Sequence, residues 1–343
     1  MQVATSPVKG KIEKNTLWTV AVSGTLLLIL AYTIYKGTHG EAVFWLVGIA
    51  FGITVQRSRF CFTSAFRDFF LLGQTRMIKG ILVGLAVCTV GFVMVMSTVS
   101  PNPGFGAPPS DANVLPVGLS TLVAGTLFGV GMVLAGGCVS GSLYRMGEGY
   151  VGSWLAIGGV MVGLFLLNNS WNWWWDNLIS SEAQIWMPAE ISYTGAIIVT
   201  TLIMAALLYL AVLRERKANA GFVMPEIKRS SEDLNPTSAV SEITGYVRNV
   251  FRKEWSPIVG GIALGVLNIL LFIRFRPLGV VGEISRWTTS ISNTLGLEEL
   301  HLKGMEGLGA CAMTVADGSW FTSGFFLNFG IVAGALASAV FAR

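Results

Sequence analysis

Long apolar runs alternate with short polar segments along this chain. Runs lie at about 42–56, 78–98, 117–135, 150–168, 192–213, 256–273 and 322–341, and an earlier one reads TLWTVAVSGTLLLILAYTIY. A bilayer core needs about 20 apolar helical residues, so most of these runs are long enough to cross it. The pattern predicts an all-α polytopic membrane protein with about eight spanning helices. The short 42–56 run is expected to tilt little or to stop inside the membrane.

The charges between the runs predict an orientation. Basic residues gather in the N-terminal tail and in segments 57–79, 136–149 and 214–255, whereas loops 99–116 and 169–191 contain no Lys or Arg. This alternation fits the positive-inside rule and predicts a cytoplasmic N-terminus. Segment 274–321, with four basic residues, is a partial exception on the outer side.

One long polar segment divides the chain. We expect a cytoplasmic tail at 1–16 and a first membrane half at 17–213. A cytoplasmic linker at 214–255 then leads to a second, shorter membrane half at 256–343. The first apolar run is too long for a signal-peptide core and lacks a clear cleavage site, so we expect it to be retained as a helix.

Composition excludes several other classes of protein. Only 12% of residues are charged, about half the usual share of a soluble domain, and mean hydropathy is +0.64. Four cysteines without a CxxC pair and two histidines favour neither a disulfide framework nor a metal site. The net charge of +4 comes without a concentrated basic patch, so no nucleic-acid partner is expected. No cofactor or nucleotide-binding motif is evident.

Two cysteines occupy matching places in an internal repeat. GIAFGITVQRSRFCFTSAFRD at 48–68 matches GTLFGVGMVLAGGCVSGSLYR at 125–145 with an offset of 77 residues. The offset aligns two glycines, a phenylalanine and the cysteines Cys61 and Cys138. In each copy an apolar helix meets a cysteine, then a short hydroxyl-bearing segment, then an arginine. Repeats with interrupted helices point to transporter binding sites.

The residues around Cys138 suggest a role for its thiol. Gly136 and Gly137 are expected to end the long helix and let the backbone turn. Cys138 would then begin a short helix whose free amides attract an anion. The candidate path residues are Cys61, Cys138, Ser140, Ser142, Thr63, Ser64, Gly136, Gly137, Arg67 and Arg145. The two arginines could draw an anion inward or form structural ion pairs with Asp68 and Glu148.

The other two cysteines carry weaker signals. Cys88 lies in the apolar run LVGLAVCTVGF, where a small packing residue is the simpler interpretation. Cys311, in GLGACAM, is compatible with either role.

RSRFCFTSAFRD at 57–68 and AGGCVSGSLYRMGEG at 135–149 closely resemble the YeeE/YedE family of sulfur-transport membrane proteins. The resemblance covers about 45–215 well and the rest more loosely. It implies an hourglass-like helical fold with re-entrant helices at its waist. It also implies thiosulfate uptake, with Cys61 and Cys138 passing the ion by weak thiol hydrogen bonds. A cytoplasmic sulfur carrier of the TusA type is an implied partner.

One departure from the family concerns the C-terminal part. Family members usually carry a second GGC-type motif there, and Cys311 does not lie in a matching context. We therefore expect either a path with two motif cysteines or a further segment supplied elsewhere.

Three functions are compatible with the sequence. The first is a transporter or channel for a small inorganic sulfur oxyanion, with thiosulfate favoured and selenium compounds of the YedE branch as the alternative. The second is a membrane thiol sulfurtransferase that carries sulfur as a cysteine persulfide. The third is a membrane anchor for a sulfur-carrier protein, with 214–255 as its docking surface. The absence of a suitably spaced base disfavours an enzyme.

Overall fold

A computed structural model gives the arrangement of most of the chain. It describes residues 39–104, 114–219, 254–275, 277–294, 302–304 and 321–342, together with residue 112 and isolated helical positions between 21 and 32. The expected tail at 1–16, most of the first apolar run and Cys311 lie outside the described residues. Most of the expected linker at 214–255 lies outside them as well.

The regular structure of the described residues is helical, apart from one isolated bridge between Val117 and Ala183, and turns and loops connect the helices. The helices are α2 (His39–Ser58), α3 (Phe62–Leu72), α4 (Arg76–Val99), α5 (Leu119–Ala135), α6 (Val139–Gly147), α7 (Val151–Asn177), α8 (Met187–Asn219), α10 (Pro257–Arg274), α11 (Val281–Thr294) and α12 (Ser323–Phe341). A short 3-10 turn at Ile179–Ser181 precedes α8. The prediction of an all-α polytopic membrane protein is confirmed.

Six stretches of the described chain are long and apolar enough to cross a membrane. They are Arg76–Val99, Leu119–Gly147, Val151–Asn177, Met187–Lys217, Pro257–Arg274 and Ser323–Phe341. Each corresponds to one of the eight predicted runs. The 42–56 run forms most of α2, which is not among the six. The remaining run lies mostly outside the described residues, so the total number of spans stays a prediction.

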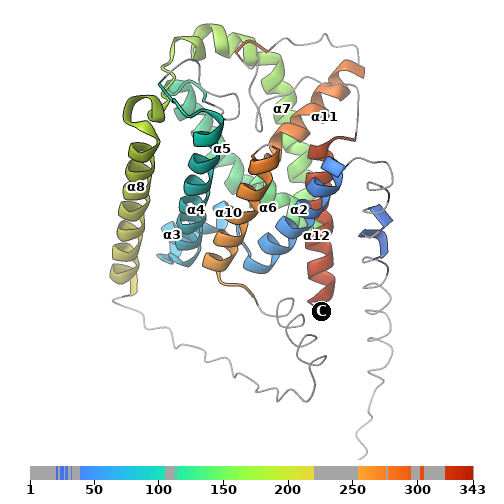
Figure 1. Ribbon diagram of the computed structural model, residues 1–343. Coiled ribbons are helices and arrows are strands. Elements are labelled where there is room, and N and C mark those ends of the chain that lie inside the picture. The colour runs from blue at the N-terminus through green and yellow to red at the C-terminus, as the bar shows by residue number, and fades with distance from the viewer. Residues whose placement is uncertain are drawn as a thin grey trace, which may run out of the picture.

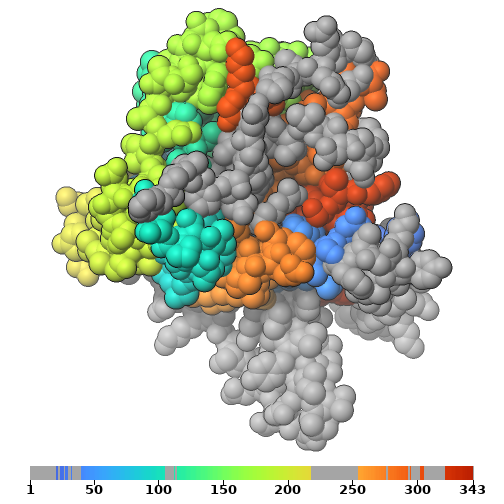
Figure 2. Space-filling model, turned by 45° about the horizontal axis from the view of Figure 1, so that its top comes forward, coloured from blue at the N-terminus to red at the C-terminus, as the bar shows by residue number. Residues whose placement is uncertain are grey.

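The helices form adjoining pairs rather than a ring (Figure 1). α2 packs along α12, α4 packs along α10, and α10 also contacts α2. α8 lies at one edge against α4, and α6 is enclosed by α12, α7 and α2. Figure 2 shows the surfaces of α4 and α10 side by side. The short helix α6 therefore lies near the middle of the bundle.

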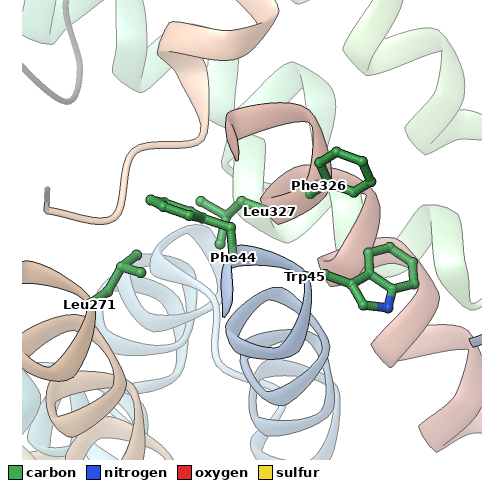
Figure 3. Packing of buried hydrophobic residues seen from close by; sticks show 5 residues of the cluster. All are labelled: Phe44, Trp45, Leu271, Phe326 and Leu327. Carbon is green, nitrogen blue, oxygen red and sulfur yellow. The ribbon is translucent and has the colours of Figure 1, made fainter. Parts of the chain in front are cut away.

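Apolar side chains from distant parts of the chain form one of the described cores. Phe44 and Trp45 of α2 meet Leu271 of α10 and Phe326 and Leu327 of α12 (Figure 3). Trp45 and Leu327 are almost completely buried. This cluster joins the beginning of α2 to helices that lie more than 200 residues later, so it links the two predicted halves of the chain.

Glycines let two helix pairs approach at backbone distance. A Cβ atom at Gly52 of α2 would lie 2.2 Å from the carbonyl oxygen of Ile331 in α12. A Cβ atom at Gly84 of α4 would lie 2.8 Å from the carbonyl oxygen of Gly261 in α10. Small residues commonly permit such close crossings in membranes. The α4–α10 crossing matters for the site, because a cavity lies along it.

Contacts between loops bring basic segments to one end of the bundle. Lys79 at the start of α4 pairs with Glu215 at the end of α8, with 2.5 Å between Nζ and Oε2. The Arg214 guanidinium lies over the rings of Phe69 and Phe70 in α3. The backbone N–H of Trp255 donates to the carbonyl of Arg57. Segments that the sequence predicts on the same side of the membrane therefore meet.

Candidate functional site

The two copies of the sequence repeat adopt the same backbone form. α2 ends at Ser58 and α5 ends at Ala135, and the next residue in each copy has a positive φ, 53° at Arg59 and 67° at Gly136. Two residues further on, Cys61 and Cys138 are the N-cap residues of α3 and α6, both in extended conformation. The 77-residue offset of the sequence is thus also an offset between helix ends, turns and caps.

Cys61 lies in a buried cradle of backbone amides. Its exposed fraction is 1%. The first-turn amides of α3 and the amide and thiol of Cys138 lie near its sulfur atom, although Cys61 makes no cap hydrogen bond to the N–H groups of α3. First-turn amides have no intrahelical acceptor, so they are available to a negatively polarised atom. The cradle can therefore favour a sulfur atom that carries partial negative charge.

Cys138 is less buried and faces a cavity. Its Sγ atom accepts a hydrogen bond from the N–H of Gly141 at 3.4 Å, and the Ser140 hydroxyl lies 3.4 Å away. Cys138 and Ser140 also line a cavity of about 180 Å³ between α4 and α10. The Cys138 thiol thus lies between the buried Cys61 sulfur and the cavity.

Gly141 lies against both sulfur atoms. A Cβ atom there would be 3.1 Å from the Cys61 sulfur and 3.3 Å from the Cys138 sulfur. Gly141 is buried in α6, where it also donates its N–H to Cys138. Gly141 is not among the path residues predicted from the sequence. Its position three residues after an N-cap cysteine is the signal that could have identified it, since the N3 amide usually meets the cap side chain.

The hydroxyl residues of the prediction lie at different distances from the thiols. Thr63 is in the first turn of α3, and its Oγ1 atom is buried without a hydrogen-bond partner among the described residues. Ser140 contacts Cys138 directly. Ser64 lies half-buried beside Thr63, and Ser142 is buried within α6. Thr63 and Ser140 are therefore the hydroxyls best placed to donate to a ligand at the thiols.

The two predicted arginines have structural partners. Arg145 donates to the carbonyl oxygen of Gly136 and lies close to Gly137, so it ties the end of α6 back to the turn after α5. Arg67 pairs with the adjacent Asp68 at 2.9 Å, and its side chain is 63% exposed. The structure therefore brings Arg145 to the cysteine turn but leaves Arg67 at a surface.

The expected pairing of Arg145 with Glu148 gives way to a different contact. Glu148 accepts a hydrogen bond from the Gln56 amide at 3.0 Å and lies 3.7 Å from the Arg59 guanidinium. Gln56 in turn accepts from the hydroxyl of Ser338 in α12. These contacts hold the end of α6 against α2 and α12.

Two further polar residues near the site were not selected from the sequence. Cys88 and Asn268 line the same cavity as Cys138. Cys88 lies in an apolar run without any local polar signal, and Asn268 is 180 residues away from it. An asparagine within the apolar run 256–273 is the only sequence signal for this pair, since amide side chains in spanning helices are costly.

Comparison with known proteins identifies the family. A family model described as "Sulphur transport" matches residues 57–343. The chain is 34% identical over 177 residues to the probable transporter YedE of Escherichia coli (strain K12), covering 50% of this chain and 40% of that protein. It is 28% identical over 225 residues to the thiosulfate transporter TsuA of the same organism, covering 66% and 58%. It is 38% identical over 131 residues to the thiosulfate transporter TsuA of Spirochaeta thermophila, covering 38% and 37%.

The aligned part thus spans between 37% and 58% of these relatives' own length. The family model, in contrast, extends over most of this chain and includes both cysteine motifs. The six apolar helices, together with relatives that are named as transporters, indicate a multi-pass membrane protein. The chain belongs to the sulphur-transport family.

Proposed function

We propose that this protein carries a small inorganic sulfur oxyanion, with thiosulfate as the preferred substrate, into the cell across the bacterial inner membrane. One observation supports this most: two cap cysteines from separate repeats place their sulfur atoms next to each other against Gly141. Two relatives are thiosulfate transporters by name, which supports the choice of substrate. The basic end of the bundle is the cytoplasmic end in this proposal, with the N-terminus on the same side.

The thiols act as successive weak sites. A thiol is a weak donor and a polarizable acceptor, so it can contact both the oxygens and the terminal sulfur of thiosulfate. The amides around Cys61 and the hydroxyls of Thr63 and Ser140 supplement these contacts. Conduction needs sites that bind well enough to admit an ion and weakly enough to release it. Neutral donors satisfy both conditions better than a fixed cation would.

Arg145 has a positioning role in this mechanism. Its guanidinium holds the Gly136 carbonyl and thereby fixes the turn that aims Cys138. Arg67 is left out of the proposed path because Asp68 occupies its guanidinium.

Uptake of labelled thiosulfate tests the proposal in cells that lack their own importers. The intact chain is expected to support uptake, and Cys61→Ala or Cys138→Ala to abolish it at equal membrane abundance. Val133→Ala, at an exposed position of α5, is the matched control and should transport normally. Uptake that persists in both cysteine variants would show that the thiols do not lie on the path.

A sulfurtransferase is the second candidate, favoured by the close approach of two thiols beside backbone amides. It predicts that the thiolate of Cys61 or Cys138 attacks the terminal sulfur of thiosulfate, which breaks the S–S bond of thiosulfate, releases sulfite and leaves a cysteine persulfide. Intact-protein mass spectrometry would detect the added sulfur atom as a mass increase of about 32 Da. A protein that only transports thiosulfate would show no such increase.

A further inference from the structure

The cavity beside Cys138 extends along two helices. Residues of α4 that line it recur at helical spacing, and so do residues of α10. They are Ile81, Gly84, Leu85 and Cys88 on α4, and Gly261, Leu264, Gly265 and Asn268 on α10. One face of each helix therefore borders the cavity for about two turns, a length of about 10 Å.

Cys88 and Asn268 lie at one end of this cavity, away from the cap cysteines. Phe60, next to Cys61, lies near Gly260 in the first turn of α10. Asn268 is two turns further along the same helix, and Cys88 lies 3.9 Å from the Gly265 carbonyl. A ligand that leaves Cys138 along the cavity would thus meet this pair on the side away from the basic end of the bundle.

The backbone orients the Asn268 side chain. The N–H of Leu278 donates to Asn268 Oδ1 at 2.9 Å. Since the oxygen is occupied, the NH2 group turns to the other side, where it lies 4.0 Å from the Cys88 sulfur. That contact is at the outer limit for a sulfur hydrogen bond, so the amide keeps donor capacity for a closer acceptor.

The chemistry of the cavity selects a particular kind of ligand. None of the described residues that line it is charged, and most are apolar. Its polar groups are the thiols of Cys88 and Cys138, the Ser140 hydroxyl and the Asn268 amide, and the Cys88 thiol donates to the Gly265 carbonyl at 3.9 Å when no ligand is bound. The apolar wall suits a soft, weakly hydrated sulfur atom, while the amide and hydroxyl suit oxygens. A volume of about 180 Å³ exceeds that of several water molecules, each of which occupies about 30 Å³ in the liquid.

We propose that Cys88 and Asn268 form a further binding position for a small oxyanion with a terminal sulfur, in line with Cys138. This inference rests on the proposed function, because it extends the same path. It reassigns Cys88, which the sequence favours as a packing residue. The path then has three thiols, one of them in the middle of an uninterrupted helix.

Differential alkylation of the intact chain in membranes tests the site without altering it. N-ethylmaleimide is applied with and without thiosulfate, and mass spectrometry measures labelling at each cysteine. Thiosulfate is expected to slow labelling of Cys88 as well as Cys138, and sulfate, which lacks a terminal sulfur, to slow neither. A cysteine introduced as Val133→Cys corrects for reagent consumed by thiosulfate itself.

The outcomes separate this inference from the proposed function. Protection of Cys138 but not Cys88 would overturn the inference and leave thiosulfate transport intact. Protection of neither, together with absent uptake, would overturn both. Protection of Cys88 by sulfate as strongly as by thiosulfate would overturn the assignment to a terminal sulfur.

Transport kinetics give an independent measurement. Cys88→Ala and Asn268→Leu are each expected to raise the KM for thiosulfate by about two- to tenfold, the effect of losing one neutral hydrogen bond. Cys88→Ser, which keeps a donor, should restore much of the loss. Val90→Ala, at an exposed position of the same helix, should leave KM unchanged. An unchanged KM in both site variants would contradict the proposal.

Discussion

The two cysteine-bearing copies share a backbone but have opposite surroundings. In the first copy the long helix α2 is packed against α12, while the short helix α3 has only Ala65 buried. In the second copy no residue of the long helix α5 is buried, whereas the short helix α6 has five of its nine residues buried. One copy anchors the bundle through its long helix, and the other places its short helix inside it.

This reversal explains how two thiols meet from segments that lie 77 residues apart. The local backbone is the same in both copies, because a positive-φ residue follows each long helix and a cysteine caps each short one. Burial is set by the partner helices instead. α6 brings Cys138 into the bundle, and α2 holds Cys61 there, so the copies contribute one sulfur atom each from different sides.

Substitution of matching glycines in the two long helices is expected to give the largest difference in stability between the two copies. Gly52→Val would drive its side chain into the Ile331 carbonyl and is expected to lower the free energy of unfolding by about 1–3 kcal/mol. The matching Gly129→Val should change stability little, since no described atom lies within 4 Å of its Cβ position. Thermal unfolding in detergent measures both. Equal losses would mean that α5 has a partner as close as that of α2.

The next largest effect concerns the contact between the thiols. Gly141→Ala is expected to reduce thiosulfate uptake roughly tenfold, because a methyl group would displace both sulfur atoms by a few tenths of an ångström. Gly131→Ala, with open space around it, is the matched control in the same copy. Normal uptake by the Gly141 variant would show that the spacing of the two sulfurs is not critical.

The turns offer a smaller test, in which the two copies respond in opposite directions. Gly136→Ala should destabilise the protein by about 1 kcal/mol, since a side chain is unfavourable at positive φ. Arg59→Gly should relieve the same strain in the first copy. It removes a 3.7 Å ion pair with Glu148, which keeps its hydrogen bond from the Gln56 amide. Denaturation midpoints of the two variants give the answer, and a loss at Arg59 as large as that at Gly136 would contradict it.

The smallest expected effect is at the arginines that follow the cysteines. Arg67→Gln should change uptake by less than about twofold, because its exposed pairing with Asp68 contributes little. Arg145→Gln should reduce uptake more, since it frees the Gly136 carbonyl. Uptake rates at matched expression rank the two, and the reverse order would place Arg67 on the path after all.

The sequence predicts the local part of this architecture well. Six apolar runs correspond to candidate spans, and the break at Gly136 follows from a pair of glycines before a polar segment. The cap role of Cys138 follows from the same pattern. Each of these features depends on neighbours within a few residues, which is the range over which apolar periodicity and turn chemistry act.

Features that depend on distant partners could not be predicted in this way. α2 and α5 are both apolar with matching glycines, so nothing local indicates that only Gly52 meets another helix. Cys88 has the same apolar setting as a packing residue until Asn268 is placed beside it. The Arg59 turn is hidden as well, because a positive φ at arginine has no residue-type signature.

The neutral lining of the cavity has a consequence for voltage. No described lining residue carries a positive charge, so the cavity does not neutralise a doubly charged anion. An inside-negative membrane potential then opposes entry by about 2.3 kcal/mol per charge for each 100 mV, roughly 4.6 kcal/mol for thiosulfate. Net inward flow through such a passage has to be driven by metabolic removal of the ion inside the cell or by accompanying cations. Depolarising the membrane should accelerate uptake when the ion crosses alone, whereas accompanying cations that balance its charge would remove this effect.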